Sequence, residues 1–162
     1  MPANAIQIKP FAGLSELEKV RALLSEYAHS LSIDLCFQNF EIELAGLPGD
    51  YAAPRGALML AWSQHELVGC CALRPLDAVD YPNACEMKRL YVRPALRGSG
   101  LGRRLAEAVM EAGQQAGYTY ILLDTLSEME TARAMYQDLG FVEVPPYYYN
   151  PIEGAHYLMA RL

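Results

Sequence analysis

The stretch MKRLYVRPALRGSGLGRRL (residues 87–105) contains the change of pattern that decides the fold. With the three residues before it, its first part predicts a long strand over 84–92, and its last part begins a helix near Leu101. A short apolar run, YILLDT (120–125), follows the helix and is typical of a buried strand. The order strand, glycine loop, helix and strand predicts a right-handed crossover between two parallel strands.

The other elements are predicted from hydrophobic periodicity and from turn signals. Apolar side chains recur at helical spacing after the glycine loop, at Leu101, Leu105, Ala108, Val109, Ala112 and Ala116. Upstream, we expect a strand over 6–11, a helix that begins at a Ser15–Glu18 capping box, a shorter helix over 37–45 and a hairpin that turns at 64–66. Downstream, we expect a helix between a Ser127–Glu130 capping box and Gly140, then strands over 141–144 and 155–162. The predicted order is βααβββαβαββ, an α/β (α+β) fold with a mixed sheet and helices on both faces, in one domain over residues 1–162.

The composition excludes several classes of function. The chain has 162 residues, a net charge of −6 and a sequence pI near 5.0, which argues against a general nucleic-acid-binding surface. It has no run of about 20 apolar residues and starts without a signal-peptide pattern, so we expect a cytoplasmic protein with no membrane partner. The cysteines and histidines lack metal-ligand spacing, which predicts free thiols and no metal: Cys36, Cys70, Cys71, Cys85, His29, His65 and His156.

Three glycines in five positions form the loop between the strand and the helix. The first turn of a helix has N–H groups without intrahelical acceptors, and its dipole favours negative charge. Without Cβ atoms, Gly98, Gly100 and Gly102 would let phosphate oxygens approach the backbone, next to Arg97 and Arg103. The pattern is neither a Rossmann fingerprint, which needs glycine at position 103, nor a Walker A loop. From the loop alone, a phosphate-binding loop and a simple tight turn remain equal alternatives.

The longer context of the loop resembles the GNAT N-acetyltransferase superfamily. The family's acetyl-CoA motif, Q/R-x-x-G-x-G/A after a strand, is matched by Arg97, Gly100 and Gly102, and MYQDLGF (135–141) is similar to its downstream signature. The resemblance implies a mixed, mostly antiparallel central sheet of about six to seven strands flanked by about four helices. It also implies acetyl-CoA as co-substrate and an amine acceptor, and it is compatible with a homodimer. The loop would hold the CoA pyrophosphate, and the end of the strand would hold the pantetheine arm and the thioester carbonyl: Arg97, Gly98, Ser99, Gly100, Leu101, Gly102 and Arg103 for the loop, and Leu90, Tyr91 and Val92 for the strand.

The resemblance further implies candidate catalytic residues. Tyr136 lies where the family places the tyrosine that protonates the departing CoA thiolate, although its apolar helix face also suits a core tyrosine. Two carboxylates are candidates for the base: Glu86 in the first strand of the crossover, which we prefer, and Asp124 at the end of the second. Glu86 would otherwise pair with Lys88, and Asp124 would otherwise cap the following turn. Met129 departs from the family, because many relatives carry at this position an asparagine that binds the pantetheine arm.

The acceptor is the least determined part of the prediction. Arg74, Lys88 and Arg89 carry charge inside predicted strands, so they either pair with carboxylates or bind an anionic acceptor such as an amino-acid-like amine. In PPYYYNP (145–151), alternation along a strand would put Tyr147 and Tyr149 on one face, where they either line the acceptor site or pack. The favoured function is acetyl-CoA-dependent transfer of an acetyl group to a primary amine, of a small molecule or of a protein, by direct attack. The alternatives are another acyl-CoA, transfer to oxygen, or a non-catalytic acyl-CoA-binding regulatory or interaction module.

Overall fold

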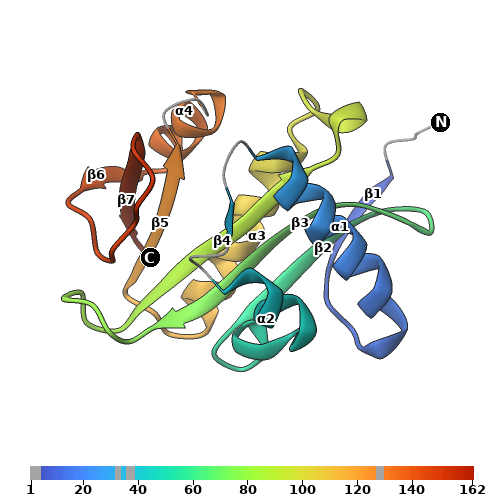
Figure 1. Ribbon diagram of the computed structural model, residues 1–162, viewed down its shortest axis with the longest axis horizontal. Helices are drawn as coiled ribbons and strands as arrows, with labels where there is room; N and C mark the ends of the chain where they lie inside the picture. Colours follow the sequence, from blue (N-terminus) through green and yellow to red (C-terminus); the bar gives the residue numbers. More distant parts are fainter. Residues whose placement is uncertain (1–4, 32–33, 36–38, 127–129) are drawn as a thin grey trace.

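The computed structural model describes residues 5–31, 34–35, 39–126 and 130–162. Within these residues the strands form one seven-stranded sheet in the order β1-β2-β3-β4-β5-β7-β6 (Figure 1). Neighbouring strands are antiparallel except β4 and β5, which run parallel. The strands are β1 (Ile6–Pro10), β2 (Ala57–Ser63), β3 (Glu66–Leu76), β4 (Ala84–Val92), β5 (Tyr120–Leu126), β6 (Val142–Val144) and β7 (Ala155–Arg161). The predicted mixed, mostly antiparallel sheet is confirmed.

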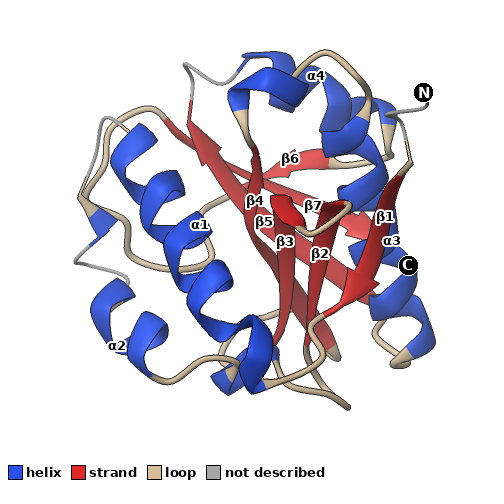
Figure 2. Cartoon of the chain, turned by 90° about the vertical axis from the view of Figure 1, so that its right-hand side faces the viewer, coloured by secondary structure: helices blue, strands red, loops and turns tan. Residues whose placement is uncertain are grey.

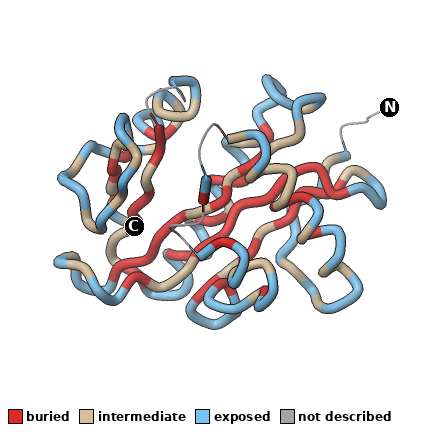
Figure 3. The backbone as a smooth tube through the Cα atoms, viewed as in Figure 1, coloured by how far each residue is buried: buried red, intermediate tan, exposed pale blue. Residues whose placement is uncertain are grey.

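Helices cover both faces of this sheet, as Figure 2 shows. They are α1 (Leu17–Ser30), α2 (Phe40–Ala45), α3 (Leu101–Gln115) and α4 (Glu130–Asp138), so the element order among the described residues is the predicted one. Successive side chains of a strand point to opposite faces, so Cys70 packs beneath α1 and Cys71 beneath α3. The sheet thus has one hydrophobic core on its α1 face and another on its α3 face. The buried residues are concentrated in the central strands between these two cores (Figure 3). The sheet is therefore covered on both sides.

Helix α3 lies against the sheet along a narrower stripe than its sequence predicts. Its buried residues are Leu101, Leu105, Ala106, Val109 and Gly113, whereas the predicted Ala116 is exposed. The helix approaches the sheet closely at Gly113, where an added Cβ would lie 3.0 Å from Leu162 Cδ1 and 3.4 Å from Cys85 Sγ. This packing fixes the direction of α3, and with it the position of the glycine loop at its N-terminus.

The parallel strands β4 and β5 are paired only at their beginnings. Their register runs from Ala84 opposite Tyr120 to Glu86 opposite Leu122, and pairing ends there. Figure 1 shows the two strands spreading apart beyond this point. On its other side β4 contains a bulge, because the three residues 70–72 of β3 lie opposite the four residues 88–91 of β4. The strand pair therefore opens in the middle of the sheet.

The helix starts differ in part from the sequence prediction. A 3-10 turn (Leu14–Glu16) precedes α1, and the Ala12 N–H donates to the Glu16 carboxylate at 2.8 Å, so the predicted Ser15–Glu18 capping box is wrong. The described part of the second helix begins at Phe40, and the predicted start at Phe37 lies outside the described residues. The same holds for Cys36 and for the capping residue Ser127. In the described part of the chain, none of the helices is long and apolar enough to span a membrane.

Candidate active site

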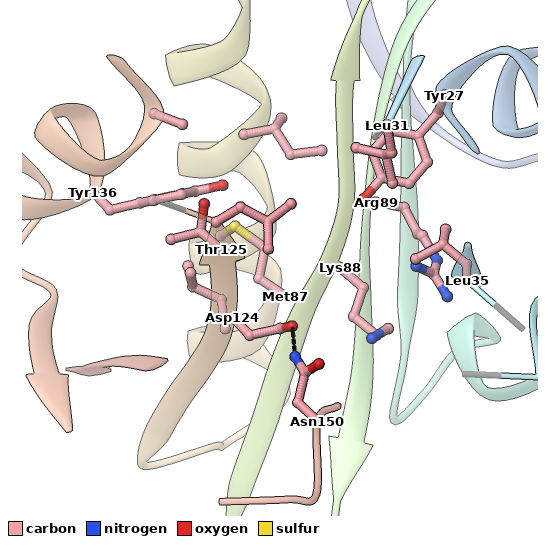
Figure 4. Close-up of a pocket in the computed structure, with 14 residues that line it drawn as sticks. Tyr27, Leu31, Leu35, Met87, Lys88, Arg89, Asp124, Thr125, Tyr136 and Asn150 are labelled. Carbon is pink, nitrogen blue, oxygen red and sulfur yellow. Dashed lines mark hydrogen bonds between the residues drawn. The ribbon is translucent and has the colours of Figure 1, made fainter. Parts of the chain in front are cut away.

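The opening between β4 and β5 contains a cavity of about 120 Å³, which we call the splay cavity (Figure 4). Side chains from both strands, from α1, from α4 and from the segment before β7 line it. Its lining includes four of the predicted site residues, Lys88, Leu90, Asp124 and Tyr136. It also includes Arg89, one of the charges expected inside the strands, and three residues that the sequence did not single out: Tyr27, Thr125 and Asn150. Residues from distant parts of the chain thus converge where the sheet opens.

The glycine loop has the backbone conformation that requires glycine. Gly98 has a φ of +83° and Gly100 a φ of +85°, in the left-handed region that other residues rarely adopt, and each would point a Cβ into open space. Helix α3 begins after Gly100 without a side-chain cap, and its first backbone bond joins the Arg104 N–H to the Gly100 oxygen at 3.1 Å. The N–H groups of the first turn are therefore available to an anion above the loop.

The polar side chains of the loop have specific contacts in this structure. Arg97 donates from Nε to the Val92 oxygen at 3.0 Å, and its guanidinium lies 5.6 Å from the centre of the Tyr91 ring. Arg103 forms an ion pair with Asp138 at the end of α4 and lies 3.4 Å from Glu107. Ser99 donates from its hydroxyl to the Leu96 oxygen at 2.5 Å, which closes the turn before the helix.

At the end of β4, successive side chains point to opposite faces of the sheet, and successive backbone N–H groups point to opposite edges of the strand. The Arg93 N–H donates to the Val68 oxygen at 2.9 Å on the β3 side, so the N–H of Val92 points to the opposite edge, where β5 has diverged. Tyr91 is buried on the α1 face, where its hydroxyl donates to Glu26 at 2.8 Å. Of the predicted strand residues 90–92, Leu90 lines the splay cavity, whereas Tyr91 pairs with Cys70 of β3 and is not part of the lining.

Glu86 lies in β4 at the last residue pair before β4 and β5 separate, and both of its carboxylate oxygens accept hydrogen bonds. Arg74 donates from Nε to Oε1 at 2.7 Å, and the Tyr147 hydroxyl donates to Oε2 at 2.7 Å. The side chain is only 1 % exposed. Burial alone would raise the pKa of Glu86, but the positive charges of Lys88 and Arg74 hold this pKa below its usual value. The carboxylate is therefore strongly held in its ionised form.

Asp124 projects from β5 into the splay cavity (Figure 4). Its Oδ2 accepts a hydrogen bond from the Tyr148 hydroxyl at 2.7 Å and a longer one from Asn150 Nδ2 at 3.4 Å. Asn150 also donates to the Tyr148 hydroxyl at 3.2 Å, while its Oδ1 accepts the Ile152 N–H at 2.9 Å. The segment before β7 therefore orients the Asp124 carboxylate at the edge of the cavity.

Tyr136 lines the splay cavity from α4 and is 6 % exposed. Its ring packs edge-on against Phe141, with 5.6 Å between the ring centres. Burial raises the pKa of Tyr136, so the phenol keeps its proton at neutral pH. Both interpretations of this tyrosine, as a core residue and as a residue facing the site, agree with its position. Met129, where the sequence departs from the family, lies outside the described residues.

Three of the four predicted acceptor-binding residues lie together. Arg74, Lys88 and Tyr147 line a second cavity of about 310 Å³, which shares Lys88 with the splay cavity and which we call the adjoining cavity. Tyr149 is 84 % exposed and is not part of either lining. The segment 145–150 is not a strand, so the alternation assumed for Tyr147 and Tyr149 does not apply, and it is Tyr148 that joins Tyr147 at the site.

Metal binding finds no support in the part of the chain that the structure describes, where no three His, Cys, Asp or Glu side chains gather as a potential metal site. Two residues that the sequence did not single out, Tyr148 and Asn150, contact Asp124. The run of tyrosines shortly before the last strand was the signal in the sequence that could have pointed to them. Their common partner, Asp124, lies 24 positions from Tyr148 and 26 from Asn150, so the contact itself has no local signal.

Comparisons with known proteins agree with this geometry. The sequence profile of the Acetyltransferase (GNAT) family matches residues 18–141. An uncharacterized N-acetyltransferase of Schizosaccharomyces pombe is 38 % identical over 162 residues, which cover 99 % of this chain and 97 % of the relative. An acetyltransferase structure from Streptococcus agalactiae has the same fold, with a TM-score of 0.78 at 21 % identity over 97 % of this chain and 98 % of that one. The structure of yncA from Salmonella typhimurium, with its cofactor acetyl-CoA, has a TM-score of 0.68 at 17 % identity over 98 % and 94 % of the two chains. The chain therefore belongs to the acetyltransferase (GNAT) family.

Proposed function

We propose that the protein transfers an acetyl group from acetyl-CoA to a primary amine by direct attack of the amine on the thioester. The observation that carries this proposal is the splay cavity, where a carboxylate from β5, a phenol from α4 and the open edge of β4 meet. Because all described strands belong to one sheet, we treat residues 1–162 as one catalytic domain. A base, a proton donor and backbone donors are the groups that acyl transfer to an amine requires.

The glycine loop and the end of β4 fit acetyl-CoA, which supplies the activated acetyl group when it is bound. The uncapped N-terminus of α3 and the free space above Gly98 and Gly100 suit the two phosphates of its pyrophosphate. The edge of β4 at Val92 faces the gap that β5 leaves, where an extended chain of amides could lie beside the strand. The acetyl-CoA in the yncA structure supports this use of the fold.

For the base, the geometry supports Asp124 in place of Glu86, which the sequence alone favoured. Both oxygens of Glu86 are occupied by Arg74 and Tyr147, and its lowered pKa reduces its affinity for a proton. Asp124 lines the splay cavity and has hydrogen-bond donors on Oδ2 alone among the described residues. We assign to Asp124 the removal of a proton from the bound ammonium, directly or through one water, which leaves a nitrogen lone pair free to attack.

Tyr136 is assigned the opposite proton transfer. When the bond between the acetyl carbon and sulfur breaks, the sulfur leaves as a thiolate and takes a proton from the Tyr136 hydroxyl. Burial raises the pKa of Tyr136, so its hydroxyl is protonated when the thiolate forms. The phenolate then regains a proton, the second one that the attacking nitrogen loses as it becomes an amide, and Asp124 passes its own proton to water. The Val92 N–H, which points to the open edge, is available to stabilise the negative charge that develops on the carbonyl oxygen.

The proposal is tested by the release of CoA thiol from acetyl-CoA in the presence of a panel of amines, with the acetylated product identified by mass spectrometry. We expect Asp124→Asn and Tyr136→Phe each to lower kcat by about 100-fold or more. The affinity for acetyl-CoA, measured by calorimetry, should stay the same. Asp77→Asn is the matched control, because Asp77 is exposed and pairs with Arg55 outside both cavities.

Three outcomes would contradict parts of this proposal. Acetyl-CoA binding without thiol release for any amine would support a non-catalytic acyl-CoA-binding module. Faster release from a longer acyl-CoA would change the co-substrate. A loss of activity in Glu86→Gln with a shifted pH profile, while Asp124→Asn keeps its rate, would return the role of base to Glu86.

A further inference from the structure

The segment 145–150 reaches a carboxylate on each of the two strands that diverge. The Tyr147 hydroxyl donates to Glu86 Oε2 on β4 at 2.7 Å, and the hydroxyl of the next residue, Tyr148, donates to Asp124 Oδ2 on β5 at 2.7 Å. The segment is not a strand, and its two neighbouring tyrosines bond different carboxylates. Of the two, Tyr148 contacts the carboxylate to which we assign the removal of a proton from the acceptor.

Ring packing holds these two tyrosines beside β7. The centres of the Tyr147 and Tyr148 rings are 5.4 Å apart, and they lie 5.5 and 5.8 Å from the centre of the Tyr157 ring. Tyr157 is buried, and it lies opposite Asp124 in the antiparallel pair of β5 and β7. Side chains at opposite positions of such a pair share one face of the sheet, so the Tyr157 ring supports Tyr148 next to the Asp124 carboxylate.

Asn150 fixes the direction of the hydrogen bond between Tyr148 and Asp124. Asn150 Oδ1 accepts the Ile152 N–H at 2.9 Å, which leaves Nδ2 to donate to the Tyr148 hydroxyl at 3.2 Å. Because this hydroxyl accepts a bond from Asn150, its single proton is available to Asp124. Asn150 Nδ2 also donates to Asp124 Oδ2 at 3.4 Å, and Figure 4 shows this bond at the edge of the splay cavity.

The two oxygens of Asp124 therefore differ. The hydrogen bonds that Asp124 receives from the described residues all reach Oδ2, and its side chain lines the splay cavity. Glu86 is different, because it accepts a hydrogen bond on each of its oxygens. Bonds to one oxygen fix the rotation of the Asp124 carboxyl group and leave Oδ1 to take a proton from a bound ammonium.

We propose that Tyr148 is a positioning residue for acetyl transfer, whose hydroxyl holds Asp124 with Oδ1 turned toward the amine of the acceptor. This inference rests on the proposed transferase function and adds to it a residue that acts through Asp124. Tyr148 lines the adjoining cavity, whereas the carboxylate that it bonds lines the splay cavity. An acceptor that fills the adjoining cavity therefore packs against the Tyr148 ring, so loss of the hydroxyl should change kcat and loss of the ring should also change KM.

The first test compares Tyr148→Phe, which keeps the ring and loses the hydroxyl, with the wild-type protein. The probe amines are 3-methylbutylamine, 2-phenylethylamine and L-leucinamide at saturating acetyl-CoA, and thiol release is followed with the fastest of them. We expect kcat to fall about 10- to 100-fold, because a hydrogen bond to a charged group is lost, and KM for the amine to change less than about twofold.

The pH–rate profile separates a positioning role from a general loss of structure. A carboxylate that loses a hydrogen-bond donor binds a proton more tightly, so the acidic limb of the profile should move to higher pH in Tyr148→Phe. The other charged side chains of the two cavities are the same in both proteins: Glu43, Arg74, Glu86, Lys88 and Arg89.

The matched control is Tyr118→Phe, which makes the same chemical change outside both cavities. The Tyr118 side chain is buried, and its hydroxyl donates to the Arg55 oxygen at 2.7 Å, the same length as the bond from Tyr148 to Asp124. The control therefore loses a comparable hydrogen bond away from the site. Its kcat and its pH–rate profile should be those of wild type.

Two further variants test the ring and Asn150. Tyr148→Leu removes the ring together with the hydroxyl, so it should also raise KM for the amine, about 3- to 10-fold. Asn150→Ala removes the donor that orients the Tyr148 hydroxyl and should lower kcat about 3- to 10-fold, with the acidic limb moved in the same direction. The affinity of the Tyr148 variants for acetyl-CoA, measured by calorimetry, should be that of wild type.

The outcomes distinguish this inference from the function on which it rests. An active wild type with unchanged kcat and pH profile in Tyr148→Phe would overturn the positioning role and leave the acetyltransferase intact. A fall in kcat without movement of the acidic limb, or an equal fall in Tyr118→Phe, would also overturn it. Absence of thiol release with every amine would overturn both the function and the inference. If Tyr148→Phe does not fold, Asn150→Ala decides by the same two measurements, because it leaves Tyr148 and Asp124 in place.

Discussion

Removing one half of the Arg89–Glu43 ion pair should destabilise the protein strongly, because this pair joins α2 to β4. The Arg89 side chain is 2 % exposed and that of Glu43 is 17 % exposed. Two hydrogen bonds connect them, and the Arg89 guanidinium lies 5.1 Å from the centre of the Phe40 ring. Arg89→Met leaves the Glu43 carboxylate without its partner, and Glu43→Met leaves the guanidinium without its own. We expect each variant to lose about 3–5 kcal/mol in the free energy of unfolding.

The double variant distinguishes an uncompensated charge from a simple loss of packing. With both residues changed to Met, no uncompensated charge is left, so the double variant should lose no more than the worse single variant. The coupling energy should then be about 2 kcal/mol or more. Urea denaturation measures it, followed by circular dichroism and by the fluorescence of Trp62, the only tryptophan of the chain.

The Arg55–Asp77 pair is the control for this cycle. It has a similar pair of hydrogen bonds, at 3.2 and 2.7 Å, but its side chains are 57 % and 71 % exposed. We expect no measurable coupling there, because water screens the exposed charges. Additive losses in the Arg89–Glu43 cycle, or a coupling no larger than that of the control, would refute the reasoning.

Three further predictions concern the loop, the buried carboxylate and the core. Gly100→Ala should weaken acetyl-CoA binding about tenfold in calorimetry, because a left-handed conformation costs a residue with a Cβ about 1–2 kcal/mol. Gly102→Ala is the control and should bind acetyl-CoA normally, since its Cβ would meet only Val92 Cγ2 at 3.9 Å. Equal losses of affinity in the two variants would contradict this reasoning. The pKa of Glu86 lies below its usual value of 4.5, so the ionised carboxylate stabilises the fold above this pH, and the stabilisation is lost as pH falls through the folded pKa. The difference in the free energy of unfolding between wild type and Glu86→Gln should therefore become smaller on acidification, as measured by urea denaturation at a series of pH values. A difference that does not change with pH would contradict this. Leu105→Ala, at a fully buried position of α3, should lower the free energy of unfolding by about 2–5 kcal/mol, and a smaller loss would mean that the neighbouring side chains refill the space.

Much of the fold could be predicted from the sequence because its signals are local. The periodicity of α3 and the glycines before it depend on residues a few positions apart, and both are confirmed. Boundaries that depend on competing contacts were less accurate. Ser15 was expected to cap α1, but the Glu16 side chain bonds the Ala12 N–H and a 3-10 turn forms first. The bulge in β4, with Arg89 at a φ of +61°, has no signal in a stretch that alternates like an ordinary strand.

The positions of the candidate site residues could be predicted only in part. Lys88, Asp124 and Tyr136 were singled out from the sequence, and the structure brings them to one cavity. The partners that distinguish Asp124 from Glu86 could not be predicted, because they come from elsewhere in the chain. Tyr147 reaches Glu86 across 61 positions, and Tyr148 reaches Asp124 across 24.

The sequence by itself therefore determined the order of the elements, the glycine loop and the family resemblance that points to acetyl-CoA. These depend on backbone conformation and hydrophobic periodicity, which each segment specifies for itself. Only the tertiary structure decided where β4 and β5 separate and which charges the arginines neutralise. The physical reason is that a carboxylate's hydrogen-bond partners and burial set its proton affinity, and both arise only when distant segments pack together.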